Sequence, residues 1–220
     1  MKKALIAIIA VIIIAIAAYA YVTRPVSAPT QDINEVSAKL PAGSATSSVY
    51  RISQEKSLVT FTMNELLNGK PKLVVGTTTQ IAGDIAVKDE RVEIGTLTLN
   101  AKTLVTDSAN RNGAIVRLIL KSDKPENEFI TFEPRSISNP AVSGGKASFD
   151  VSGDVTISGV TKPAVFTVVA NVTDNSIIGT AETKLKRSDF GLIIPNLSFI
   201  ANVDDEFPIK AEIVAERIMR

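Results

Sequence analysis

The feature that most constrains the fold of this chain is a series of strand-like segments joined by short polar turns. Val, Ile and Thr make up 49 of the 168 residues from 50 to 217, a composition typical of β-strands. Apolar and polar residues alternate within the segments, as at Val59, Phe61 and Met63. Three pairs of segments are predicted to form hairpins: 81–87 with 92–99, 130–138 with 147–157, and 164–172 with 177–186.

The remaining segments complete an antiparallel meander. Strands are predicted at 49–53, 57–64 and 207–217, and the last is expected to pair with the first. One helix is predicted at 108–120, because Ile115, Leu118 and Ile119 share a helical face. Closing the strands would remove exposed sheet edges, so the sequence predicts an all-β fold: an antiparallel up-and-down eight-stranded barrel with one short helix. Such a barrel can be packed with side chains or can hold one small ligand, and composition leaves both open.

The N-terminus carries a long uncharged segment. Residues 4–22 are 19 residues without a charge, preceded by Lys2 and Lys3. As a helix they would rise about 28 Å, close to one hydrocarbon core. Residues 1–22 are therefore predicted to be a transmembrane signal anchor that places the C-terminal domain outside the cytoplasm. The alternative is a signal peptide cleaved near Ala20, which would leave a secreted or periplasmic protein.

The segment that follows, residues 23–47, contains three prolines and no aromatic residue. A segment of this composition buries too little apolar surface to offset the entropy of ordering it. It is predicted to be a flexible linker, which leaves residues 48–220 as the barrel domain.

Composition also excludes several functions. The chain has no His, Cys or Trp, which excludes disulfides, zinc fingers, thiol nucleophiles and histidine-based catalysis. Its formal net charge of +1 argues against a general nucleic-acid binder. The prediction is that the protein is not an enzyme and uses no cofactor or bound metal.

Three polar segments remain as candidates for chemistry. Residues 204–206 are all acidic and could bind Ca²⁺ or act as paired acid and base, but they also fit a solvated loop. Arg111 begins the predicted helix and could recognise a polar head group, or it could belong to an ordinary cap and surface pair. Lys162 is most simply a turn residue.

The order of the segments resembles the YceI-like family, lipocalin-like barrels associated with polyisoprenoid or other lipid binding in bacterial envelopes. The segments that carry the resemblance are 50–52, 57–61, 83–85, 103–106 with Arg111, 129–132, 153–163, 187–191 and 203–209. The chain departs from the family pattern at Asn112, in place of an Asp, and at Ser158, where many members have His. Residues 118–128 also lack the family's paired Phe.

The resemblance implies an extracytoplasmic lipid-binding protein that holds a polyisoprenoid or similar apolar chain in a barrel cavity. The alternative is an envelope interaction or scaffold protein with a packed barrel and no ligand, which would use loops such as 190–205. The expected partners are a lipid, the membrane through the N-terminal helix, and a second copy of the chain. The expected apolar lining is Val59, Phe61, Met63, Ile81, Ile94, Ile130, Phe132, Phe149 and Val151, and the expected polar mouth is Arg111, Lys162 and Arg187.

Overall fold

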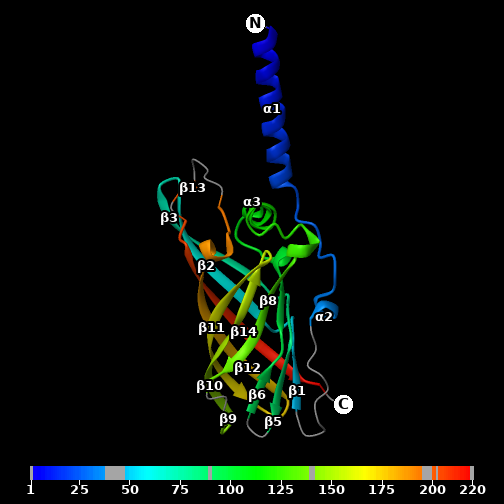
Figure 1. The fold of residues 1–220 in the computed structure, drawn as a ribbon, viewed down its shortest axis with the longest axis vertical. Coiled ribbons are helices and arrows are strands. Elements are labelled where there is room, and N and C mark those ends of the chain that lie inside the picture. The colour runs from blue at the N-terminus through cyan, green and yellow to red at the C-terminus, as the bar shows by residue number, and fades with distance from the viewer. Residues whose placement is uncertain are drawn as a thin grey trace.

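The structure is a curled sheet with helices at one end. This computed structural model describes residues 2–37, 48–88, 91–138, 142–194, 200–201 and 203–218. Figure 1 shows α1 projecting from the end of the sheet at which α3 lies. The helical elements are α1 (Lys2–Thr23), α2 (Ile33–Val36), α3 (Ala109–Ala114), the 3₁₀ turns η1 (Ala101–Thr103), η3 (Pro125–Asn127) and η4 (Arg187–Phe190), and the π-helical segment η2 (Ile115–Ile119).

All strands of the described residues belong to one antiparallel sheet of fourteen strands. The strands are β1 (Ser48–Ile52), β2 (Leu58–Leu67), β3 (Lys70–Thr78), β4 (Ile81–Ala82), β5 (Asp84–Lys88), β6 (Arg91–Ile94), β7 (Leu97–Asn100), β8 (Phe129–Ile137), β9 (Val142–Ser143), β10 (Lys146–Ile157), β11 (Val160–Val172), β12 (Ser176–Lys186), β13 (Ile200–Ala201) and β14 (Glu206–Arg217). Their order is β4-β7-β8-β10-β11-β12-β14-β1-β5-β6; in addition, β2 pairs with β3, β13 and β14, and β9 pairs with β10. The prediction of an all-β antiparallel fold with a short helix is confirmed.

The three predicted hairpins form as β5 with β6, β8 with β10 and β11 with β12, and the β8–β10 pair shifts register between Ser152 and Gly153. β10 and β11 pair from Lys146↔Asn171 to Ile157↔Val160. The two residues between these strands, Ser158 and Gly159, have φ angles of 49° and 77°, and two residues with positive φ fit the strand twist in a tight hairpin turn. The turn of the 81–87 and 92–99 hairpin includes residues 89 and 90, which lie outside the described residues. The expected pairing of the last strand with the first is confirmed by the β1–β14 ladder.

The predicted number of eight strands is wrong, because expected strands are interrupted. The segment 81–87 divides at Gly83 into β4 and β5, and 92–99 divides into β6 and β7. A Cβ on Gly83 would lie 2.5 Å from the side chain of Leu97 and 3.2 Å from the carbonyl oxygen of Thr96, so the two chains approach too closely there for a larger residue.

Strand β3 is absent from the sequence prediction. It begins directly after Asn68 and Gly69, which have φ angles of 50° and 74°. An Asn-Gly pair is the strongest short-range signal for a two-residue hairpin turn. The signal for β3 was therefore present in the sequence.

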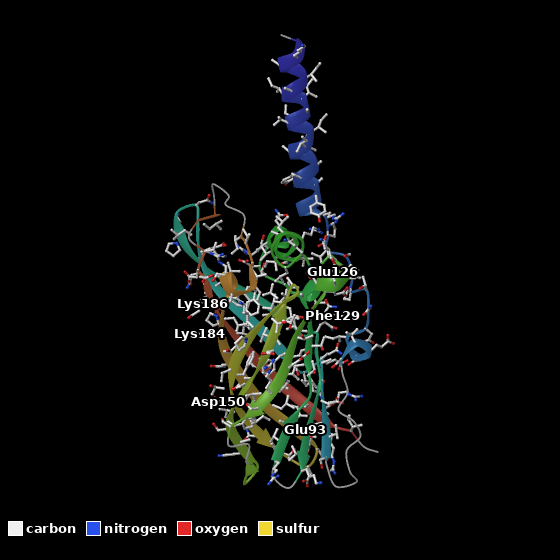
Figure 2. All side chains as sticks on the ribbon, viewed as in Figure 1. Glu93, Glu126, Phe129, Asp150, Lys184 and Lys186 are labelled. Atoms are coloured by element: carbon white, nitrogen blue, oxygen red, sulfur yellow. The ribbon has the colours of Figure 1, made fainter. Side chains whose placement is uncertain are left out.

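Alternation places the apolar side chains of the sheet on its inner side. On β10, Phe149, Val151 and Val155 are buried while Asp150 is exposed. Figure 2 shows Asp150, Lys184 and Lys186 along the outside of the sheet. The buried core therefore lies within the curl.

The N-terminal helix does not support the predicted anchor. No helix among the described residues is long and apolar enough to cross a membrane, so the predicted single-pass anchor is wrong. The expected membrane contact through the N-terminal helix is not supported by the structure. Cleavage near Ala20 stays a prediction.

Residues 24–33, here named the N-terminal strap, follow α1 and lie against the barrel. The sequence predicts a flexible linker here, yet the strap makes defined contacts. Arg117 of η2 donates from Nη2 to the carbonyl oxygens of Arg24 at 2.5 Å and Pro25 at 2.7 Å. Ile33, at the end of the strap, is buried where α2 contacts β4 and β7.

A buried carboxylate fixes the middle of the strap. Glu128, fully buried, accepts hydrogen bonds from the amide of Thr30 at 2.8 Å and from the Thr30 hydroxyl. It also binds Nζ of Lys102 at 3.0 Å and Nδ2 of Asn100 at 3.0 Å. Burial alone would raise the pKa of Glu128, but hydrogen bonds from Thr30, Lys102 and Asn100 outweigh it and hold the pKa below its ordinary value.

We expect Glu128→Gln to lower the free energy of unfolding by about 3–5 kcal/mol near pH 7, because it leaves the ammonium of Lys102 buried without a carboxylate. Since the folded-state pKa of Glu128 is depressed, its stabilisation is present above the unfolded-state pKa of about 4.3 and is lost as pH falls through the folded-state value. Urea unfolding at pH 7 and at acidic pH measures both effects. Glu212→Gln, which removes an exposed carboxylate paired with Lys210, is the control and should change little; equal losses in the two variants would contradict the expectation.

Candidate functional site

The inside of the curled sheet holds a cavity of about 780 Å³. It is lined mainly by aliphatic and aromatic side chains. These come from strands all around the curl of the sheet and from the segment containing α3 and η2. Its volume falls within the range of about 300–1,000 Å³ that is common for small-molecule sites. The cavity is therefore the candidate site.

Most of the predicted apolar lining faces this cavity. The residues that line it are Val59, Phe61, Met63, Ile81, Ile94, Ile130, Phe132 and Val151. Phe149 does not; it lies in the adjoining hydrophobic core, 8% exposed. The choice of inward-facing positions from strand alternation thus agrees with the cavity at these eight positions.

Sequence reasoning missed two groups of lining residues. The first comes from the helical segment, where Ile115, Leu118 and Ile119 face the cavity, and their helical spacing was the available signal. The second consists of small residues on the central strands: Ala170, Gly179, Ala181 and Ala211. Alanine at inward positions of a strand leaves space unfilled, whereas Gly179 allows a close approach of the neighbouring strand, and this pattern of small residues was also present in the sequence.

Four charged side chains lie together at the α3 end of the cavity. Arg111 binds Oε1 of Glu65 at 2.9 Å and also pairs with Asp107, which accepts from Nζ of Lys72 at 2.6 Å. Their exposed side-chain fractions fall from 53% for Asp107 and 38% for Lys72 to 18% for Arg111 and 7% for Glu65. The cluster therefore extends from solvent into the interior, and we name these four residues the mouth cluster.

The mouth cluster joins two separate parts of the chain. Glu65 and Lys72 lie on the β2–β3 hairpin, whereas Asp107 and Arg111 belong to the segment that begins α3. Ser108 caps α3 by accepting from the amide of Arg111 at 3.4 Å, which fixes where the arginine side chain leaves the helix. The ion pairs hold the hairpin against the helix beside the cavity.

The structure brings together two of the three predicted mouth residues. Arg111 and Arg187 line the cavity, but Lys162 is exposed on β11 opposite Val155 and does not line it. Arg187 donates from Nε to the carbonyl oxygen of Asp204 at 3.1 Å, and it lies 3.9 Å from Oδ1 of Asp205.

The acidic segment 204–206 contacts three different partners. Asp204 accepts from Nδ2 of Asn64 at 2.8 Å, and Glu206 pairs with Lys184 at 3.3 Å. Asp205 accepts from the amide and hydroxyl of Ser188, and these hydrogen bonds hold its pKa below the ordinary value. The arrangement is that of a loop held by hydrogen bonds, as the structural interpretation of this segment predicts.

Two of the departures from the family pattern, Asn112 and Ser158, have local roles. Oδ1 of Asn112 accepts from the amide of Thr106 at 2.8 Å and from its hydroxyl at 2.7 Å, so it orders the turn before α3. Ser158 donates from Oγ to the carbonyl oxygen of Leu120 at 2.6 Å, which ties the β10–β11 turn to the end of η2. Both residues support the segment that covers one end of the cavity.

A family model described as the YceI-like domain matches residues 50–215. The chain belongs to this family. The matched residues contain all fourteen strands except the first residues of β1 and the last of β14, so the YceI-like domain is the curled sheet itself. No curated protein sequence matches the chain.

Solved structures share this fold at low sequence identity. BcnA of Burkholderia cenocepacia has a TM-score of 0.59 at 18% identity, covering 74% of this chain and 98% of its own. A polyisoprenoid-binding domain of Saccharophagus degradans, implicated in plant cell wall breakdown, has a TM-score of 0.61 at 15% identity, covering 77% and 98%. The YceI protein of Campylobacter jejuni has a TM-score of 0.54 at 17% identity, covering 66% and 85%. These similarities establish the fold of the YceI-like domain.

The mouth cluster gives a prediction for the titration of Asp107. A hydrogen bond from Lys72, reinforced by the charge of Arg111, holds the pKa of Asp107 below its ordinary value. We expect Lys72→Met to raise this pKa towards the ordinary value of about 3.9. Carboxyl ¹³C NMR titration measures it, and Asp205, whose pKa is lowered by Ser188, is an internal control that should not move. An unchanged Asp107 would show that Lys72 does not contact it in solution.

Proposed function

We propose that this YceI-like protein binds a long apolar lipid, such as a polyisoprenoid, inside the barrel and does not chemically transform it. The observation that carries the proposal is the apolar cavity of about 780 Å³. Each methylene group moved from water into such a cavity contributes about 0.8 kcal/mol, so a chain of ten or more carbons gains ample binding energy.

The distribution of polar groups supports an amphiphile. Charged lining residues belong to the mouth cluster and to Arg187, and the remaining lining is dominated by aliphatic and aromatic side chains. A ligand with an apolar tail and one polar end matches this division. The similarity in fold to a polyisoprenoid-binding domain is consistent with the same choice.

The alternative, a packed scaffold that works through its loops, has less support. A packed barrel would leave no cavity of this size. Part of the loop expected to contact a partner, residues 195–199 and 202, lies outside the described residues. Pairing of two copies of the chain stays a prediction.

A pair of neighbouring substitutions tests the proposal. Val168 of β11 lines the cavity, whereas Val169, next to it, is exposed on the outside. We expect Val168→Trp to reduce the lipid that copurifies with the full-length protein at least about fivefold, because the indole occupies ligand space, and Val169→Trp to leave it unchanged. Native mass spectrometry and solvent extraction measure the bound lipid, and thermal unfolding checks that both variants fold.

The matched pair also identifies where the lipid binds. Equal loss, or no loss, in the two variants would place any bound lipid outside the cavity, for example on the exposed apolar side chains of α1. Wild-type protein that carries no lipid and takes up no added isoprenoid would contradict the proposed function altogether.

A further inference from the structure

Each cation that lines the cavity among the described residues already has a carboxylate beside it. Among the described lining residues, the charged ones are Glu65, Lys72, Asp107, Arg111 and Arg187. The mouth cluster contributes two positive and two negative charges, and Arg187 lies 3.9 Å from Asp205. The cavity therefore offers a ligand no cation without a carboxylate beside it.

Arg111, the least exposed of the cations that line the cavity, is held from two sides. Glu65 binds one of its terminal nitrogens at 2.9 Å and Asp107 pairs with the other. Glu65 is 7% exposed, so moving the guanidinium towards a ligand would leave a nearly buried carboxylate unpaired, which is strongly destabilising. Arg111 therefore stays paired with Glu65 and Asp107 and does not bind the ligand.

An anionic head group would meet unfavourable contacts at this mouth. To reach Arg111 or Lys72 it must approach Glu65 and Asp107, and like charges brought together cost free energy. An uncharged head group meets no such repulsion. Ser108 and Asn110 line the same end of the cavity and offer a hydroxyl and an amide as neutral hydrogen-bonding groups.

We propose that the cavity selects an amphiphile whose polar end is uncharged, such as an alcohol or an amide, and discriminates against the phosphate or diphosphate ester of the same chain. Glu65 and Asp107 are the residues that determine this specificity, because they neutralise Arg111 and Lys72 and repel an anion. The inference rests on the proposed function, since it concerns the head group of the lipid held in the cavity.

The test uses two probes with one tail. Geranylgeraniol and geranylgeranyl diphosphate differ only in the head group, and each is used to displace a fluorescent isoprenoid from the full-length protein. We expect the alcohol to displace the probe at a concentration at least about tenfold lower than the diphosphate. Since tenfold corresponds to about 1.4 kcal/mol, one unfavourable charge contact suffices.

The specificity variant is Glu65→Gln with Asp107→Asn, which frees both cations of the mouth cluster. We expect its affinity for the diphosphate, measured relative to its affinity for the alcohol, to rise at least about tenfold. Glu212→Gln with Glu216→Gln is the matched control, because it changes the net charge by the same two units. Both glutamates are exposed on β14, where Glu212 pairs with Lys210 and Glu216 pairs with Lys56. The control should leave the preference unchanged, because the effect depends on position and not on net charge.

A single substitution keeps the test valid if the double variant does not fold. Asp107 is half exposed, so Asp107→Asn alone is expected to fold and to shift the preference in the same direction by a smaller factor. Equal affinity for the two probes in the wild type, or preference for the diphosphate, would overturn the inference while leaving lipid binding intact. Failure of both probes to bind would instead overturn the proposed function, and the inference with it.

Discussion

The structure depends on one constraint: the inner face of the curled sheet is apolar, but its side chains do not fill the space they enclose. Strand alternation turns aliphatic and aromatic residues inward, and this burial drives the sheet to curl. On the central strands several inward positions carry Ala or Gly instead. At Gly179 a Cβ would lie 2.7 Å from Cβ of Ala170 and 2.6 Å from the carbonyl oxygen of Val169, so close contact between strands keeps that position small. The cavity is thus a consequence of the same pattern that makes the sheet.

The short helical segment connects the cavity with the N-terminal strap. Ile115 and Ile119 of η2 line the cavity, while Arg117 in the same segment holds the carbonyl oxygens of Arg24 and Pro25. The π-helical hydrogen bond from the amide of Leu120 to the carbonyl oxygen of Ile115 belongs to this segment, and π-helical turns of this kind occur frequently at functional sites. One segment therefore faces the ligand space on one side and anchors the strap on another.

Much of the fold and of the cavity could be predicted because both follow from residue periodicity. Alternation at Val59, Phe61 and Met63 identified the inner face of β2 without any tertiary information. The contacts of the strap could not be predicted, because they involve Glu128, a buried carboxylate separated from Thr30 by 98 residues of sequence. Pairing within the mouth cluster was also beyond the sequence, since Glu65 and Arg111 meet only through the packing of the β2–β3 hairpin on α3.

The departure from the family pattern at Asn112 is consistent with an uncharged mouth. Its Oδ1 accepts two hydrogen bonds from Thr106, a task that a carboxylate oxygen could also perform. An Asp at this position would keep both hydrogen bonds but would add a negative charge one residue from Arg111, where Glu65 and Asp107 already balance the positive charges. The amide therefore preserves the structure of the turn without disturbing that balance. Neutrality at the mouth thus arises from paired charges, and Asn112 adds no further charge beside them.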